Sequence, residues 1–92
     1  MDNFQNSNKR FIYSYFNRNE PEKIRQVVPI HVEYWKAANL RGHMGGPFAD
    51  RTGGLISFVA SSLEEATDII LQDPFILEDL IAEKWMKEWI VE

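Results

Sequence analysis

Two side chains of this 92-residue chain have the types needed for proton transfer, His31 and Asp73. Histidine, with an ordinary pKa of about 6.5, suits a general acid or base at neutral pH. A carboxylate that contacts an imidazole can orient the ring and stabilise its protonated form. The residue spacing places His31 on the apolar face of a predicted helix, and ionisable groups in such shielded positions often belong to active sites. His31 and Asp73 are therefore our candidates for acid–base chemistry.

Both residues also have a structural interpretation. A buried histidine can simply be satisfied by a backbone carbonyl group, because histidines in structural networks occur as well as histidines in active sites. Asp73 directly precedes Pro74, and aspartate before proline is an ordinary turn and cap residue. From the residue types alone, the chemical and the structural interpretation both stay open.

A turn of small residues, Gly45, Gly46 and Pro47, follows the predicted helix and is a candidate pocket wall. Glycine lets backbone N–H groups approach a ligand, although two glycines before a proline are also typical of a bulge. The segment lacks the spaced glycines and the lysine of a phosphate-binding loop. His43, beside this turn, is predicted to lie on the surface. We expect the tryptophans to pack in the core or in a dimer contact: Trp35, Trp85 and Trp89.

The composition excludes several classes of function. The chain has 10 basic and 14 acidic residues and a net charge of −4, so neither nucleic acid nor an anionic membrane is expected as a partner. It has no cysteine, which excludes disulfides and thiol catalysis. Two histidines do not make the usual metal site without a third ligand, and we expect no metal and no cofactor.

The distribution of apolar residues indicates a protein of the cytoplasm. Hydrophobic residues make up 45% of the chain, which is typical of a compact globular domain. The first residues contain no continuous apolar segment of the kind found in secretory signals. No apolar run approaches the roughly 20 residues that span a bilayer, so we expect no membrane insertion.

The first half of the chain predicts a strand and a long helical region. Residues 10–16 are mostly aromatic and β-branched, as in a strand with both faces largely covered. Asn19 is the expected helix cap, Pro29 is expected to open the main helix after a break, and Gly42 is expected to end it. This arrangement places His31 in a first helical turn, near the positive end of the helix dipole. One helical face carries Ile24, Val27, Val28, His31, Tyr34, Trp35 and Ala38.

The second half predicts a hairpin, a capped helix and a last strand. Ser62 and Glu65 have the spacing of a capping box, and Asp73 before Pro74 is expected to end that helix near Gln72. The predicted elements are a short irregular strand at 43–48, a strand at 55–60, a helix from Ser62, a further helical turn within 75–81 and a strand at 83–91.

This order of elements predicts an α+β domain of the ferredoxin-like, split βαβ type, over residues 10–92, after a mobile polar tail at residues 1–9. Such a sheet has helices on one face. The aromatic strands would leave a large apolar patch on the other face unless a second copy covered it. We therefore predict a homodimer that packs through its sheet faces.

The order and spacing of five short segments resemble the YciI-like (YCII-related) family. They are residues 29–31, 45–48, 53–54, 62–66 and 73–75. The resemblance implies a dimeric α+β barrel and an active site that pairs His31 with Asp73. The family often has an arginine before the proline that precedes the histidine, whereas this chain has Val28; Arg25 lies one turn earlier and could reach the same region.

The resemblance also implies a reaction class, because one member of the family is a dehydrochlorinase of a chlorinated hydroxyquinol that needs no metal or organic cofactor. We predict that the following residues bind a small organic substrate: Arg25, Tyr34, Gly46, Pro47, Phe48 and Phe75. The leading hypothesis is a cofactor-independent acid–base enzyme of lyase or isomerase type. The alternatives are a non-catalytic dimeric module that binds a small ligand or serves as an accessory subunit, and a purely structural domain.

Overall fold

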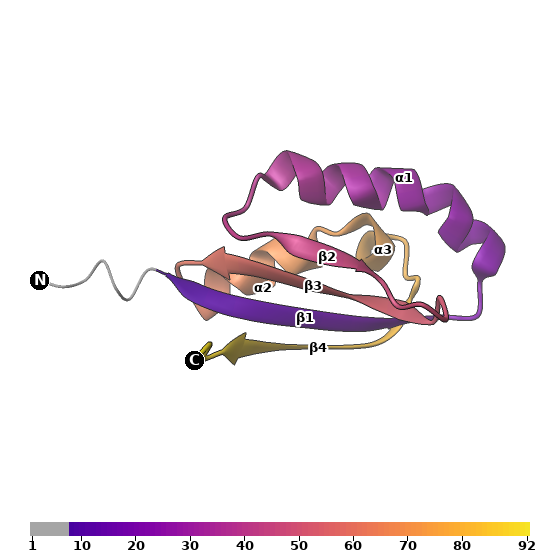
Figure 1. Ribbon diagram of the computed structural model, residues 1–92. Coiled ribbons are helices and arrows are strands. Elements are labelled where there is room, and N and C mark those ends of the chain that lie inside the picture. Colours follow the sequence, from indigo (N-terminus) through magenta and orange to yellow (C-terminus); the bar gives the residue numbers. More distant parts are fainter. Residues whose placement is uncertain (1–7) are drawn as a thin grey trace, which may run out of the picture.

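The computed structural model describes residues 8–92, which form one antiparallel sheet with helices on one of its faces (Figure 1). The elements are β1 (Lys9–Asn17), α1 (Pro21–Ala38), β2 (Met44–Pro47), β3 (Gly53–Ala60), α2 (Leu63–Leu71), α3 (Pro74–Leu77) and β4 (Ile81–Trp89). The strand order across the sheet is β2-β3-β1-β4, so β1 and β3 are central. This topology confirms the predicted ferredoxin-like α+β fold.

Strand β1 lies between β3 and β4, and its side chains alternate between the two faces of the sheet. Phe11, Tyr13 and Tyr15 point to the helices and are all at most 4% exposed. They pack with buried side chains of β3 and with the helices, including Phe58 and Trp35. The strand begins at Lys9, one residue before the predicted strand, and residues 1–7 of the predicted tail lie outside the described residues.

Two glycines of β3 allow Tyr15 to lie close to its neighbouring strand. A Cβ atom on Gly53 would lie 1.9 Å from the Tyr15 carbonyl oxygen, and one on Gly54 would lie 2.4 Å from the Tyr15 hydroxyl oxygen. No side chain fits at these distances, so both positions require glycine. The close approach fixes the Tyr15 ring beneath α1, where it becomes part of the site described below.

The predicted break before Pro29 is wrong. Helix α1 is continuous, with Pro29 in its interior and Pro21 in its first turn. Pro29 lies on the exposed side of the helix, so water can solvate the carbonyl group that loses its hydrogen bond. The opposite face buries Val27, His31 and Trp35, and this burial holds the helix together across the proline. His31 is consequently in the middle of α1, away from the positive end of the dipole.

The predicted ends of α1 are also wrong. The residue at its N-cap is Glu20, without a side-chain cap, rather than Asn19. The helix ends at Ala38, and Asn39 takes the left-handed conformation (φ 49°) that was expected of Gly42. Among residue types, asparagine is second only to glycine in tolerating this conformation. Gly42 also has a positive φ (62°), but in the turn that leads to β2.

The second half of the chain follows the prediction closely. The Ser62 side chain accepts a hydrogen bond from the Glu65 backbone N–H (3.0 Å), as in the predicted capping box, although the Glu65 carboxylate returns to Ser61 rather than to Ser62. The further helical turn is α3, and β4 begins at Ile81, two residues before the predicted strand. In residues 8–92, no helix has the length and apolar character required to cross a bilayer.

Candidate active site

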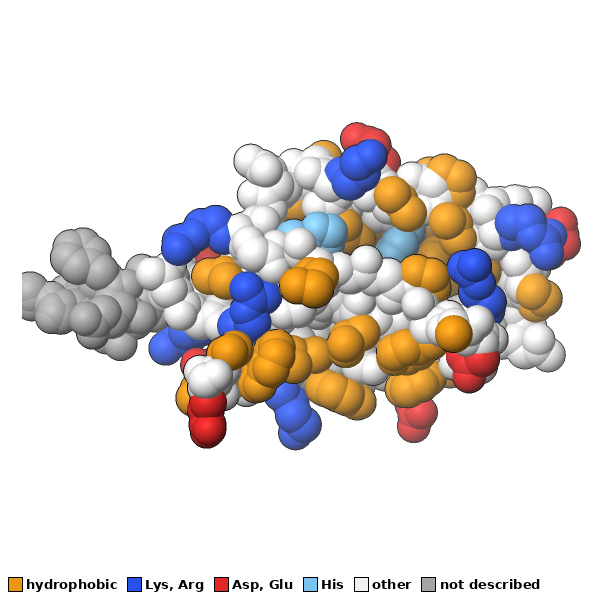
Figure 2. Space-filling model, in the orientation of Figure 1, with side chains coloured by type: hydrophobic (Ala, Val, Ile, Leu, Met, Phe, Trp, Pro, Cys, Tyr) orange, Lys and Arg blue, Asp and Glu red, His pale blue; other side chains and the backbone are white. Residues whose placement is uncertain are grey.

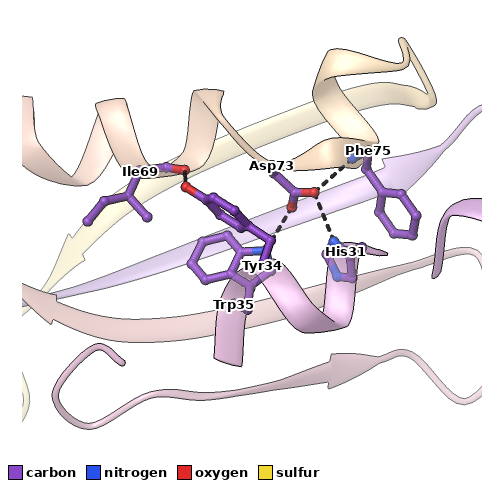
Figure 3. A network of polar contacts seen from close by, with 6 residues as sticks. All are labelled: His31, Tyr34, Trp35, Ile69, Asp73 and Phe75. Atoms are coloured by element: carbon purple, nitrogen blue, oxygen red, sulfur yellow. Dashed lines mark hydrogen bonds and ion pairs between the residues drawn. The ribbon is translucent and has the colours of Figure 1, made fainter. Parts of the chain in front are cut away.

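His31 and Asp73 are in direct contact, although 42 positions separate them in the chain. His31 extends from the buried face of α1 and is 9% exposed. Its Nδ1 atom lies 2.9 Å from Oδ1 of Asp73 (Figure 3). Since Nδ1 faces the carboxylate, Nε2 is the ring nitrogen that remains for a ligand.

Asp73 is fixed by the first turn of α3, where it is the N-cap residue and is fully buried. Its Oδ1 also accepts a hydrogen bond from the Phe75 backbone N–H (2.8 Å), as N-cap residues do. Its Oδ2 accepts the indole N–H of Trp35 at 2.9 Å (Figure 3). Three groups able to donate therefore surround one carboxyl group, and this arrangement fits an ionised carboxylate that accepts from Nδ1–H of His31.

Aromatic rings hold the imidazole in one orientation. Phe75 stacks on the His31 ring with a centroid distance of 4.0 Å and an interplanar angle of 10°. Tyr15 contacts the ring edgewise at 5.9 Å and 65°. The ring is therefore fixed by packing as well as by its hydrogen bond to Asp73. Such preorganisation is what a proton-transfer group requires.

A cavity of about 260 Å³ opens beside this ring, between α1 and β2. Its wall consists of Tyr15, His31, Val32, Trp35, Lys36, His43, Gly45, Gly46, Pro47 and Ile56. Figure 2 shows both histidines, in pale blue, in the hollow below α1. A smaller hollow of about 150 Å³ shares Tyr15 and Pro47 with it and also contacts Phe75. The arrangement can bind a small, mostly apolar molecule next to an oriented imidazole.

The structure brings together some of the predicted substrate-binding residues and separates others. Gly46 and Pro47 line the main cavity, and Phe75 stacks on His31. Three others lie elsewhere. The Tyr34 hydroxyl donates to the Ile69 carbonyl, Phe48 packs on Phe16, and Arg25 is exposed and paired with Glu22. A role of those three in substrate binding stays a prediction.

Two residues of the site were missed as functional groups. Trp35 is a core residue, as one of the two predicted roles had it, but it also orients Asp73 through its indole N–H. His43 is exposed, as predicted, yet it lines the cavity and stacks on Trp35. His31 and Trp35 are four residues apart, which puts both side chains on one helical face, and this spacing was the available signal for a role of Trp35 in the site. No local pattern in the sequence indicates that His43 lines the cavity.

Comparison with known protein families supports the resemblance seen in the sequence. A family model for the YCII-related domain matches residues 9–90. The chain belongs to the YCII-related family. A relative within the curated proteins is the uncharacterised protein YjpA of Bacillus subtilis (strain 168), which is 44% identical over 52 residues. That match covers 56% of this YCII-related chain and only 60% of the relative's length.

Two solved structures share the fold of this YCII-related protein. One is the 5-chloro-2-hydroxyhydroquinone dehydrochlorinase of Burkholderia phenoliruptrix AC1100 in complex with 2,5-dihydroxybenzoquinone, with a TM-score of 0.78 and 21% identity over 88% of this chain and 93% of that one. The other is a dimeric ferredoxin-like protein of unknown function from Thermobifida fusca YX, with a TM-score of 0.57 and 13% identity over 92% of each chain. At these identities, the likeness shows the fold.

The tyrosines around the site of this YCII-related protein have raised pKa values. Burial, and secondly the charge of Asp73, raises the pKa of Tyr15 to about 12. The same two causes, in the same order, raise the pKa of Tyr13 and of Tyr34. The tyrosine hydroxyls therefore stay neutral at physiological pH.

Within residues 8–92, no three His, Cys, Asp or Glu side chains lie close enough together to hold a metal ion.

These shifts predict a loss of stability at alkaline pH. Above about pH 10, tyrosines ionise in the unfolded chain while Tyr15 stays neutral in the folded one up to about pH 12. The unfolded state then binds fewer protons, so the free energy of unfolding falls as the pH rises through this range. Urea unfolding at several pH values should show this fall, and Tyr15→Phe should make it less steep. A curve that is equally steep in Tyr15→Phe would contradict the assignment.

Proposed function

We propose that this chain is a small acid–base enzyme in which His31 exchanges a proton with a small organic substrate. The observation that carries the proposal is the contact of 2.9 Å between Nδ1 of His31 and the buried carboxylate of Asp73, on a ring that lines a cavity. Nδ1–H donates to Asp73, so the lone pair of Nε2 is available to the substrate. When Nε2 takes up a proton, the adjacent carboxylate stabilises the imidazolium.

The cavity limits the substrate to a small molecule. A volume of about 260 Å³, with a neighbouring hollow of about 150 Å³, suits one ring with a few substituents. The wall is mostly apolar and includes the aromatic side chains of Tyr15 and Trp35. We propose an aromatic or enolisable ring compound as the substrate class.

The dehydrochlorinase that shares the fold supplies a concrete reaction to test. In a dehydrochlorination, His31 would remove one proton from the substrate, the electron pair would form a new double bond, and chloride would leave to the solvent. An isomerase-type reaction would use the same proton transfer, with the proton returned to another atom of the substrate. Both reactions need one base of the kind that His31 provides.

Two assays test the proposal directly. Release of chloride from 5-chloro-2-hydroxyhydroquinone tests the elimination, and exchange of ring protons for deuterium in enolisable ring compounds, followed by NMR, tests proton transfer without a leaving group. We expect the protein to accelerate at least one of these reactions. Binding of these compounds without any acceleration would instead favour a non-catalytic ligand-binding module, and neither binding nor acceleration would favour a structural domain.

We also propose that the protein is a homodimer that packs through the sheet face opposite the helices. The strand register puts Leu55, Ser14 and Trp85 side by side on that face, and Leu55 and Trp85 are 40% and 46% exposed. Trp89 and Met44 extend the same face and are also exposed. Figure 2 shows hydrophobic side chains gathered along this side of the molecule. An exposed apolar patch of this kind marks a contact surface.

The dimer predicts a clear effect of a charge on this face. Light scattering at micromolar concentration should give the mass of two chains for the unmodified protein. Trp85→Glu should shift the mass towards one chain, because it buries a carboxylate in an apolar contact. Leu77→Glu is the matched control, since Leu77 is 62% exposed on α3 and should leave the dimer intact. A single-chain mass for the unmodified protein would contradict the proposal.

A further inference from the structure

The cavity beside His31 has an unbalanced charge. Its wall holds Lys36 and two imidazoles, whereas none of its ten lining residues is an aspartate or a glutamate. This is notable in a chain whose net charge is −4. The carboxylate of Asp73 lies behind the His31 ring and is fully buried, so it does not face a ligand. The lining therefore favours a negatively charged ligand.

His43 stacks on Trp35 at the wall of this cavity. The two rings are nearly parallel, with an interplanar angle of 7° and a centroid distance of 6.0 Å. The same indole donates its N–H to Asp73, and Trp35 is only 3% exposed. The Trp35 side chain therefore contacts both the His43 ring and the carboxylate that faces His31. Among residues 8–92, no partner holds the ring nitrogens of His43, so they can reach a ligand.

Lys36 adds a cation to the wall of the same cavity. It follows Trp35 directly and lies in the last turn of α1, where a positive charge is also favourable for the helix. The described part of the chain offers its ammonium group no ion pair. Lys36 is the single lysine or arginine among the ten residues that line the main cavity. The main cavity of this protein therefore takes its positive charge from Lys36.

We propose that Lys36 and His43 form an anion-binding end of the cavity, so that the ligand is a small planar organic anion. Its anionic oxygen, a carboxylate, enolate or phenolate, lies between these two donors, and its apolar body extends along Tyr15 and Pro47 to His31. Lys36 and His43 are specificity-determining residues in this arrangement. The inference rests on the proposed function for the role of His31, but it concerns binding, which can be measured without turnover.

The test compares an anionic with an uncharged ring. The probes are 2,5-dihydroxybenzoquinone, an acidic hydroxyquinone, and hydroquinone, which is neutral at pH 7, and NMR titration gives both affinities. Lys36→Met removes the cation, and His43→Phe keeps the stacking on Trp35 but removes the ring nitrogens. We expect each change to weaken binding of the anionic probe by about tenfold and to change binding of hydroquinone by less than about twofold.

Two further variants make the result specific. Lys23→Met makes the same charge change on an exposed part of α1 and should leave both affinities unchanged. Arg51 lines the smaller hollow and is the alternative cation near the site, so Arg51→Met tests whether the anion binds there instead; we expect it to weaken binding of the anionic probe less than Lys36→Met does. The inference is overturned if the anionic probe does not bind, if Arg51→Met weakens it instead, or if both probes lose affinity equally. If binding follows the prediction but His31→Gln leaves turnover intact, the proposed function fails while the anion site stands.

Discussion

Replacing His31 with glutamine is expected to lower the rate of proton transfer by about a hundredfold to ten-thousandfold. A glutamine amide can still donate to Asp73, so the buried carboxylate keeps a partner and the fold should persist. What is lost is the basic nitrogen that faces the cavity. The measurement is the rate of chloride release or of deuterium exchange on a substrate that the unmodified protein converts.

The control for this change is Glu33→Gln, which alters an exposed residue of the same helix. It should leave the rate unchanged. Ligand binding measured by NMR separates the possible causes: we expect His31→Gln to bind the substrate within about threefold of the unmodified protein while turnover is lost. A variant that turns over at the original rate would show that His31 is not the base.

Replacing Asp73 with alanine is expected to lower the free energy of unfolding by about 3 kcal/mol or more. The change leaves three donors without their acceptor in a buried region: Nδ1–H of His31, the indole N–H of Trp35 and the backbone N–H of Phe75. It also removes the N-cap of α3. Urea unfolding followed by tryptophan fluorescence measures the loss.

Two variants separate the stability of the fold from the chemistry of the site. Asp68→Ala removes an exposed carboxylate of α2 and should change stability by less than about 0.5 kcal/mol. Asp73→Asn keeps the shape but has no negative charge to stabilise an imidazolium. We expect it to retain more stability than Asp73→Ala and still to lose most of the turnover. Full activity in Asp73→Asn would mean that Asp73 has only a structural role.

Much of the fold could be predicted because local signals agree with the final packing. Alternating aromatic residues gave β1, the Ser62 cap gave the start of α2, and Asp73 before Pro74 gave its end. The interpretation of Pro29 failed for a physical reason. A local rule about proline was outweighed by the burial of residues on both sides of it, which the sequence does not quantify.

The site could be predicted only in part. The resemblance to a family, rather than the spacing of the residues, paired His31 with Asp73, and the two side chains do meet. The cavity wall depends on how α1 lies over β2, which no local pattern determines. This is why His43 was placed simply on the surface and why Tyr34 was expected near the substrate, whereas its hydroxyl contacts α2.

The most direct test of the central claim is the tautomer of the His31 ring, measured by long-range proton–nitrogen NMR on the neutral ring. We predict a proton on Nδ1, held by Asp73, and an unprotonated Nε2 facing the cavity. We also predict that Asp73→Asn changes the proportions of the two tautomers. A ring protonated on Nε2 in the unmodified protein would contradict the account, because no base would then face the substrate.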